Sequence, residues 1–187
     1  MKPGALLLTP GAGSSSDHPA LKAIEAAVAP MPVARVDFPY RKEGRRAPDR
    51  APKLLATIRE EAAVLVAAAG IRPAALALGG RSMGGRMCSM AVADGLPAAA
   101  LVLISYPLHP PGKPGNLRVE HFPELHVPCL FVSGTKDPFG SPAELEAHTA
   151  SIPGAVTHVW IDGGGHDFKR HDEFVATTVR DWLRRVR

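Results

Sequence analysis

A chain of 187 residues can form one complete hydrophobic core but is too short for two ordinary enzyme domains, so we expect a single domain over residues 1–187. Apolar residues make up 45% of the sequence and charged residues 21%, a composition that excludes a disordered chain. The formal net charge of +4 does not predict a nucleic-acid partner, because the densest basic stretch, residues 41–46, contains an acid and a glycine and no stacking aromatic residue.

The sequence favours neither a membrane partner nor an export signal. The longest apolar runs, such as residues 98–104, are far shorter than the roughly 20 residues of a membrane-spanning helix. The apolar run at residues 5–8 is too short for a signal peptide and fits a strand better. Cys88 and Cys129 have no CxxC partner, so we expect reduced, buried thiols. We expect a cytoplasmic monomer or homodimer that uses no cofactor and no metal.

Short apolar runs alternate with helical patterns along the chain, which predicts βαβ units and a mostly parallel sheet of about six to seven strands with helices on both faces. In chain order, we expect strand 5–9, helix 18–28, strand 33–38, helix 52–69, strand 74–78, helix 83–93, strand 99–104, strand 129–133, helix 142–151, strand 156–161 and helix 173–185. Segments 39–51 and 107–128 remain unassigned, and the prolines of the second predict an ordered loop.

Helix ends carry clear signals at two of the expected helices. Pro52 lies in the first turn of one helix, and Gly70 follows its end, where a left-handed residue is least costly. Ser141 precedes another helix, with Glu144 at its third position, which is the pattern of a capping box. These signals support the expected helix boundaries.

The strongest local motif is a strand, residues 76–78, that leads into G-x-S-x-G and then into a helix. A nucleophile on such a sharp turn leaves little room for side chains, which explains Gly80 and Gly84 on either side of Ser82. The N–H of Met83 then points toward a reacting carbonyl and can stabilise an oxyanion. A glycine-rich turn that only connects a strand to a helix has the same local pattern.

A serine hydroxyl needs a histidine base and an acid that orients this base. Asp137 follows the expected strand 129–133, and His166 follows the expected strand 156–161. Functional groups of open α/β sheets lie at the carboxyl ends of strands, and the order Ser82, Asp137, His166 is that of α/β-hydrolases. We therefore predict these three residues as the catalytic residues.

Other assignments remain open for the acid and the base. Asp137 could be a turn residue before proline, with Asp162 as the orienting acid. His166 could be a solvated loop residue, or it could join Asp167 and His171 in a metal site, for which the sequence supplies no fixed third ligand.

A second oxyanion donor is expected in the loop after the first strand, residues 9–16, where glycines allow close approach of a backbone amide. We predict the amide of Ala12 as this donor and that of Gly13 as the second candidate, and we expect Gly13 to contact the substrate. A phosphate-binding loop is the rival interpretation, but the segment lacks the lysine of the G-x-x-x-x-G-K-[ST] motif.

The remaining predictions concern substrate binding. Arg81, beside the nucleophile, and Tyr106 are predicted to contact the substrate, and we expect loops 39–50 and 106–120 to form the walls of a shallow site. Arg86 could also bind a substrate carboxylate, but we expect it to anchor backbone carbonyls instead.

Together these segments resemble a small family of predicted α/β-hydrolases that is similar to dienelactone hydrolases. The family includes the hydrolase-like subunit of a eukaryotic histone acetyltransferase complex. The segments are GAG at 11–13, DFPY at 37–40, GGRSMGGR at 79–86, YPLHPPGKP at 106–114, GTKDPFG at 134–140 and GHD at 165–167. The resemblance covers nearly the whole chain and implies a compact α/β-hydrolase fold without a lid domain and the triad Ser82, Asp137 and His166. Residues 9–10 are Thr-Pro where many hydrolases carry His-Gly.

These observations predict a serine hydrolase that cleaves an ester or thioester of a small molecule through an acyl-enzyme at Ser82. The alternative is a non-catalytic scaffold or binding protein that keeps the fold, since fold alone does not establish activity. Acyl transfer to an acceptor other than water would use the same residues.

Overall fold

The centre of the fold is a parallel β-sheet. The structure is a computed structural model that describes residues 1–167 and 170–187. The strands in this part of the chain are β1 (Ala5–Thr9), β2 (Val33–Arg35), β3 (Leu76–Arg81), β4 (Ala100–Ile104), β5 (Cys129–Gly134) and β6 (Val156–Ile161). They form one sheet in the order β2-β1-β3-β4-β5-β6, and all neighbouring strands are parallel. The predicted fold class is confirmed.

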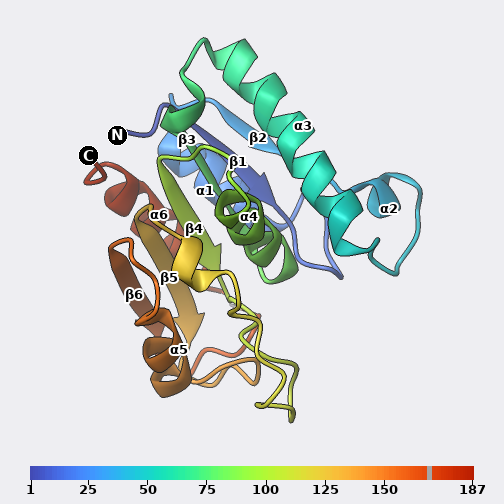
Figure 1. The fold of residues 1–187 in the computed structure, drawn as a ribbon, viewed down its shortest axis with the longest axis vertical. Helices are drawn as coiled ribbons and strands as arrows, with labels where there is room; N and C mark the ends of the chain where they lie inside the picture. The colour runs from blue at the N-terminus through green and yellow to red at the C-terminus, as the bar shows by residue number, and fades with distance from the viewer. Residues whose placement is uncertain (168–169) are drawn as a thin grey trace.

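Helices cover both faces of this sheet. They are α1 (Pro19–Val28), α2 (Pro39–Lys42), α3 (Ala51–Ala69), α4 (Met83–Ala93), α5 (Pro142–Thr149) and α6 (Asp172–Leu183), with 3-10 turns at Pro73–Ala75 and Phe122–Glu124. In Figure 1, α3, α4 and α5 lie in front of the sheet, and α1 and α6 lie behind it. The arrangement has three layers, with the sheet buried between two layers of helices.

The continuous apolar runs of the strands follow from this layering. Leu101 and Leu103 of β4 are buried on the side of α3 and α4, whereas Val102 and Ile104 are buried on the side of α1 and α6. Because successive side chains of a strand point to opposite faces, a strand covered on both sides needs apolar residues at every position.

The second strand is shorter than the sequence predicts. The expected strand 33–38 ends at Arg35, and Phe38 instead precedes α2, with Pro39 at the start of that helix. Proline suits a first helical position, because its fixed φ matches the helix and its missing N–H has no acceptor there. The buried rings of Phe38 and Tyr40 stack with centroids 6.3 Å apart, which holds this turn against the core.

Other boundaries differ by a few residues. The expected strand 74–78 begins only at Leu76, because Pro73–Ala75 forms a 3-10 turn, and it extends to Arg81, directly before Ser82. The capping box of Ser141 and Glu144 is present at α5. Gly70 ends α3 with φ +62°, as expected for a left-handed residue after a helix.

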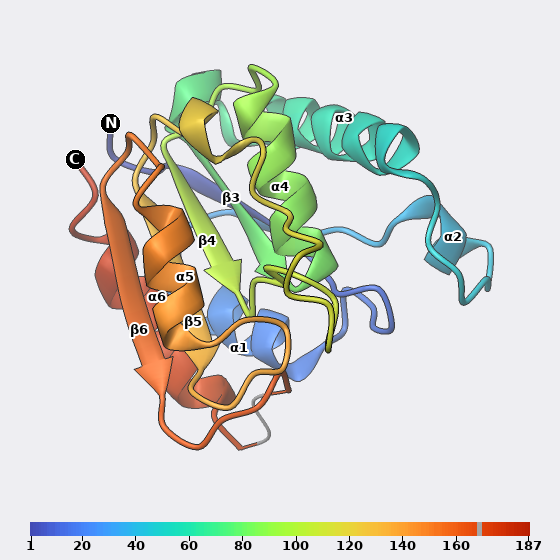
Figure 2. The same ribbon diagram turned by 60° about the horizontal axis from the view of Figure 1, so that its bottom comes forward.

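The carboxyl ends of the strands lie together at one edge of the sheet. In Figure 1 the arrowheads point toward the bottom of the molecule, and Figure 2 brings this edge forward and shows the loops that follow the strands gathered there. The strands therefore bring residues 82, 137 and 166 to the same edge from distant parts of the sequence. Among the described residues, no helix is both long and apolar enough to cross a membrane.

The two cysteines are expected to be unreactive in the native protein. Cys88 is fully buried, Cys129 is buried, and burial raises the pKa of both thiols to about 12. Since the thiolate is the nucleophile, a raised pKa leaves almost none of the reactive form at neutral pH. A disulfide reagent such as DTNB should titrate no thiol in the native protein and both thiols after unfolding in guanidinium chloride. Rapid stoichiometric labelling of the native protein would contradict this burial.

Candidate active site

Ser82 lies at a strained turn between β3 and α4. Its backbone has φ +51° and ψ −121°, a region that residues other than glycine rarely adopt. The Ser82 amide donates a hydrogen bond to the carbonyl of Ile104 at 2.8 Å, which ties the turn to β4. The turn thus holds the Ser82 hydroxyl above the carboxyl edge of the sheet, at the N-terminus of α4.

The glycines around Ser82 allow the backbone to pass close by. A Cβ atom on Gly80 would lie 2.2 Å from the carbonyl oxygen of Thr9, and one on Gly84 would lie 2.5 Å from the same atom. A Cβ atom on Gly11 would lie 3.4 Å from Cβ of Ser82, so the loop after β1 runs directly beside the nucleophile. The turn therefore depends on close contact between β1, β3 and the first turn of α4.

Substitution of Gly84 by Ala is expected to destabilise this contact, because the added methyl group meets backbone carbonyl oxygens that cannot move independently. Overpacking of this kind costs about 1–3 kcal/mol of unfolding free energy. Equilibrium denaturation in urea measures the loss. Gly13→Ala is the matched control, since a Cβ there meets nothing within 4 Å. Equal stability of the two variants would contradict the contact.

His166 connects Ser82 to Asp137. Its Nε2 lies 2.8 Å from Oγ of Ser82, and its Nδ1 lies 2.8 Å and 3.0 Å from the two carboxylate oxygens of Asp137. Both ring nitrogens are thereby engaged, which leaves neither one to bind a metal ion. The alternative acid, Asp162, instead accepts a hydrogen bond from the hydroxyl of Thr135 at 3.2 Å. The structure thus brings together the three residues that the sequence suggested.

The Asp137 carboxylate is buried and held in place. Its Oδ1 accepts a hydrogen bond from the amide of Phe139 at 2.9 Å, and its side chain is only 2% exposed. The Phe139 ring packs against the imidazole of His166, with centroids 4.0 Å apart and an angle of 30° between the rings. Phe139 therefore fixes both the acid and the plane of the histidine ring. Sequence reasoning missed it, because an aromatic residue two positions after an acid is no distinctive signal.

Two side chains hold the backbone of His166. Nη2 of Arg81 donates a hydrogen bond to the His166 carbonyl at 2.8 Å, and the hydroxyl of Ser105 donates to the same oxygen at 3.0 Å. Ser105 is buried at the end of β4 with φ +48°. Burial lowers the pKa of Arg81, and the charge of Asp167, 3.4 Å away, partly offsets this effect. Arg81, predicted to contact the substrate, is engaged in positioning the histidine, and Ser105 was not predicted at all.

The candidate oxyanion donors lie on α4 and on the loop after β1. Met83 occupies the first position of α4, where a helix provides no internal acceptor for the amide and the helix dipole favours negative charge. The Ala12 carbonyl accepts a hydrogen bond from the hydroxyl of Tyr40 at 2.9 Å, which fixes the loop after β1. Gly13 is exposed on this loop. The roles of Met83, Ala12 and Gly13 stay predictions.

Tyr106 lies in the core under the loop after β4. It is 1% exposed, and its hydroxyl donates a hydrogen bond to the carbonyl of Arg118 at 2.6 Å. Burial raises the pKa of this hydroxyl. Tyr106 therefore fixes the loop of residues 107–121 from beneath, and in this structure its ring packs against Phe122 and Phe131.

The fold and the site together define the α/β-hydrolase class. Its features are a parallel sheet covered by helices on both faces and a serine on a strained turn between a strand and a helix. A sequence model described as an alpha/beta hydrolase domain matches residues 2–186. The chain belongs to this family, which confirms the resemblance to α/β-hydrolases.

Solved structures show the same fold. A dienelactone hydrolase from Anabaena variabilis superimposes with a TM-score of 0.78 at 18% identity, over 99% of this chain and 87% of that one. The esterase domain of a Rhodothermus marinus protein gives 0.73 at 16% identity, over 99% and 88%. Est1E from Butyrivibrio proteoclasticus gives 0.72 at 17% identity, over 97% and 87%. At such low identity, these similarities establish the fold alone.

Proposed function

We propose that the protein is a serine hydrolase that cleaves an ester or thioester bond of a small molecule through an acyl-enzyme at Ser82. The observation that carries this proposal is the position of His166, whose two ring nitrogens lie 2.8 Å from the Ser82 hydroxyl and 2.8 Å from the Asp137 carboxylate. Such a chain of hydrogen bonds is the geometry of a nucleophile, its base and the group that orients the base.

In the proposed reaction, Ser82 attacks the substrate carbonyl while Nε2 of His166 takes the hydroxyl proton. Nδ1 keeps its proton and donates it in a hydrogen bond to Asp137, which stabilises the imidazolium. The amides of Met83 and Ala12 stabilise the oxyanion. His166 then gives its proton to the leaving alcohol or thiol, and water, activated by the same imidazole, releases the acid from Ser82.

The family and the fold support hydrolysis over a purely structural role. Two of the structural neighbours are described as a dienelactone hydrolase and an esterase domain, and both names denote cleavage of a carbon–oxygen ester bond. The strained backbone of Ser82 favours catalysis as well, because a turn that only connects a strand to a helix needs no such strain.

A chain-length series of p-nitrophenyl esters and acyl-coenzyme A thioesters tests the proposal. We expect saturable hydrolysis of at least one series, with a burst of p-nitrophenol equal to the enzyme concentration where deacylation is slow. Added alcohols or amines report acyl transfer through the products formed. The scaffold interpretation would be favoured if the folded protein hydrolysed no member of either series and intact-protein mass spectrometry detected no acyl group on it.

A further inference from the structure

Arg86 is a half-buried arginine that, among the described residues, forms no ion pair. It lies one turn after Ser82 on α4, and its amide donates a hydrogen bond to the Ser82 carbonyl at 3.1 Å. Its Nε atom is buried without a hydrogen-bond partner. Within residues 1–167 and 170–187, its side chain forms no ion pair, and no backbone carbonyl accepts from it. The expectation that Arg86 anchors backbone carbonyls is therefore wrong for this structure.

A second arginine, Arg118, lies on the loop after β4, near enough to Arg86 for the two charges to interact. Its backbone is fixed, because its amide donates to the carbonyl of Leu108 at 2.9 Å and its carbonyl accepts from Tyr106. Its guanidinium, in contrast, makes a single hydrogen bond within residues 1–167 and 170–187, a long contact of 3.5 Å with the Pro107 carbonyl. Burial lowers the pKa of Arg118, and the nearby charge of Arg86 lowers it further.

Among the described residues, the neighbouring side chains form no ion pair with Arg86 or Arg118, and the nearby acid, Glu120, acts on His121 only through its charge. His121 bonds through Nε2 to the hydroxyl of Ser89 at 2.8 Å, and Ser89 in turn donates to the Arg86 carbonyl. Burial and the charge of Arg86 lower the pKa of His121 to about 4, so this ring is neutral at neutral pH. Glu120 is exposed and, among the described residues, forms no ion pair with either arginine.

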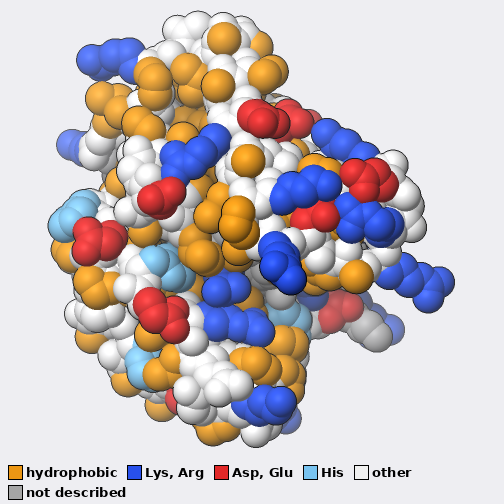
Figure 3. Space-filling view, turned by 45° about the vertical axis from the view of Figure 1, so that its right-hand side comes forward, with side chains coloured by type: hydrophobic (Ala, Val, Ile, Leu, Met, Phe, Trp, Pro, Cys, Tyr) orange, Lys and Arg blue, Asp and Glu red, His pale blue; other side chains and the backbone are white. Residues whose placement is uncertain are grey.

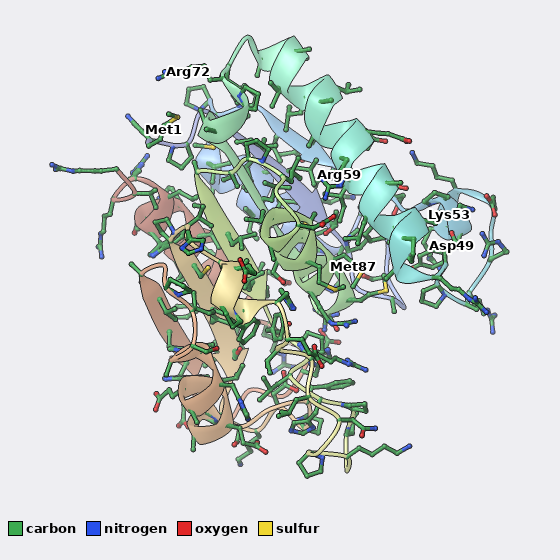
Figure 4. All side chains as sticks on the ribbon, viewed as in Figure 1. Met1, Asp49, Lys53, Arg59, Arg72 and Met87 are labelled. Carbon is green, nitrogen blue, oxygen red and sulfur yellow. The ribbon has the colours of Figure 1, made fainter. Side chains whose placement is uncertain are left out.

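Several other arginines of the protein have acidic partners. Arg45 pairs with Asp49 at 2.9 Å beside Lys53, where α3 begins, and Arg59 pairs with Asp94. Figure 4 shows Asp49 and Lys53 together at that end of α3, and Figure 3 shows charged side chains of both signs interspersed over much of one face. Arg86 and Arg118, in contrast, are half-buried and form no ion pair among the described residues, and an unpaired charge removed from water is costly.

We propose that Arg86 and Arg118 form an anion-binding subsite beside Ser82, which binds an acidic group of the acyl substrate. The proposal rests on the proposed hydrolase function and narrows its substrate class to esters or thioesters that carry a carboxylate or a phosphate group. A guanidinium suits either group, because its fork of N–H donors matches two oxygens at once. Bound there, the acidic group would hold the substrate while its carbonyl faces Ser82.

Matched ester pairs test the subsite. We compare kcat/KM for mono-p-nitrophenyl glutarate with that for p-nitrophenyl pentanoate, which has the same number of acyl carbons but no charge. Arg86→Gln and Arg118→Gln are each expected to lower the ratio of the two values by about 10-fold to 100-fold, the effect of losing a hydrogen bond to a charged group. Arg72→Gln is the control, since Arg72 is exposed near the far end of α3 (Figure 4) and its variant should keep the wild-type ratio.

Direct binding separates this proposal from the hydrolase function. Calorimetry with glutarate and with inorganic phosphate, on wild-type protein and both variants, needs no catalysis and shows which anion binds. We expect one anion to bind wild-type protein at least about 10-fold more tightly than either variant. If Arg86→Gln fails to fold, Arg118→Gln on the loop decides the outcome. Absence of binding in the wild type, or unchanged binding and ester ratio in the folded variants, would overturn the subsite.

Failure of the anion-binding subsite can be distinguished from failure of the proposed hydrolase function. Variants that hydrolyse both esters with the wild-type ratio would remove the subsite and leave the hydrolase function intact. Wild-type protein that binds an anion at Arg86 and Arg118 but hydrolyses no ester would keep the subsite and remove the proposed function.

Discussion

Replacing Ser82 by Ala is expected to lower kcat for ester hydrolysis by about 10³-fold or more, because removal of a nucleophile eliminates the acyl-enzyme route. The His166 base lies 2.8 Å from the Ser82 hydroxyl, and the substitution leaves it with no proton to accept from that position. The variant should keep its fold, since alanine loses only the hydroxyl. Initial rates with the best p-nitrophenyl ester of the series measure the effect.

Ser151→Ala is the matched control for this experiment. Ser151 is exposed just after α5, and its hydroxyl donates a hydrogen bond to the carbonyl of His148 at 2.9 Å. This variant should retain wild-type rates. Hydrolysis by Ser82→Ala at a rate close to that of Ser151→Ala would mean that another residue, or a contaminating esterase, performs the reaction.

Asp137→Asn is expected to lower kcat/KM by roughly 10²-fold to 10⁴-fold while the fold is kept. An asparagine oxygen can still accept the Phe139 amide, but its NH₂ group would then face Nδ1 of His166. An amide donor at that position favours the tautomer with the proton on Nε2, and this tautomer cannot accept the Ser82 proton. Steady-state kinetics and circular dichroism together separate this effect from misfolding.

Asp162→Asn is the control that decides between the two candidate acids. Asp162 bonds to the hydroxyl of Thr135 and not to His166, so its variant should retain most of the activity. A large loss in Asp162→Asn with little loss in Asp137→Asn would show that the observed pairing of Asp137 with His166 is not the catalytic one.

The sequence predicted the fold class and the grouping of Ser82, Asp137 and His166 because each signal was local. Ser82 and Asp137 each follow a buried strand and His166 follows the partly buried edge strand β6, and parallel strands bring their carboxyl ends to one edge whatever the details of packing. The strand order itself, with β1 between β2 and β3, had no such local signal. The end of β2 also depends on packing, because the buried rings of Phe38, just before α2, and Tyr40, within α2, pack against the core.

The residues that hold His166 in place could not be predicted, because their roles depend on contacts between distant segments. Ser105 binds the carbonyl of His166, which is 61 positions away in the sequence. Arg81 and Arg86 show the same limit: the motif places both near Ser82, yet Arg81 binds a backbone carbonyl and Arg86 binds none among the described residues. The direction of a long side chain is set by its surroundings, and spacing along the chain does not reveal it.

The central claim is that Ser82 is an activated nucleophile. Its most direct test is to treat the native protein with a fluorophosphonate probe and to locate the adduct by peptide mass spectrometry. We expect one probe per chain on Ser82, and no adduct on the Ser82→Ala or unfolded protein, because activation requires the assembled His166 and Asp137. Folded wild-type protein that takes up no probe, or that carries it on another residue, would contradict the account.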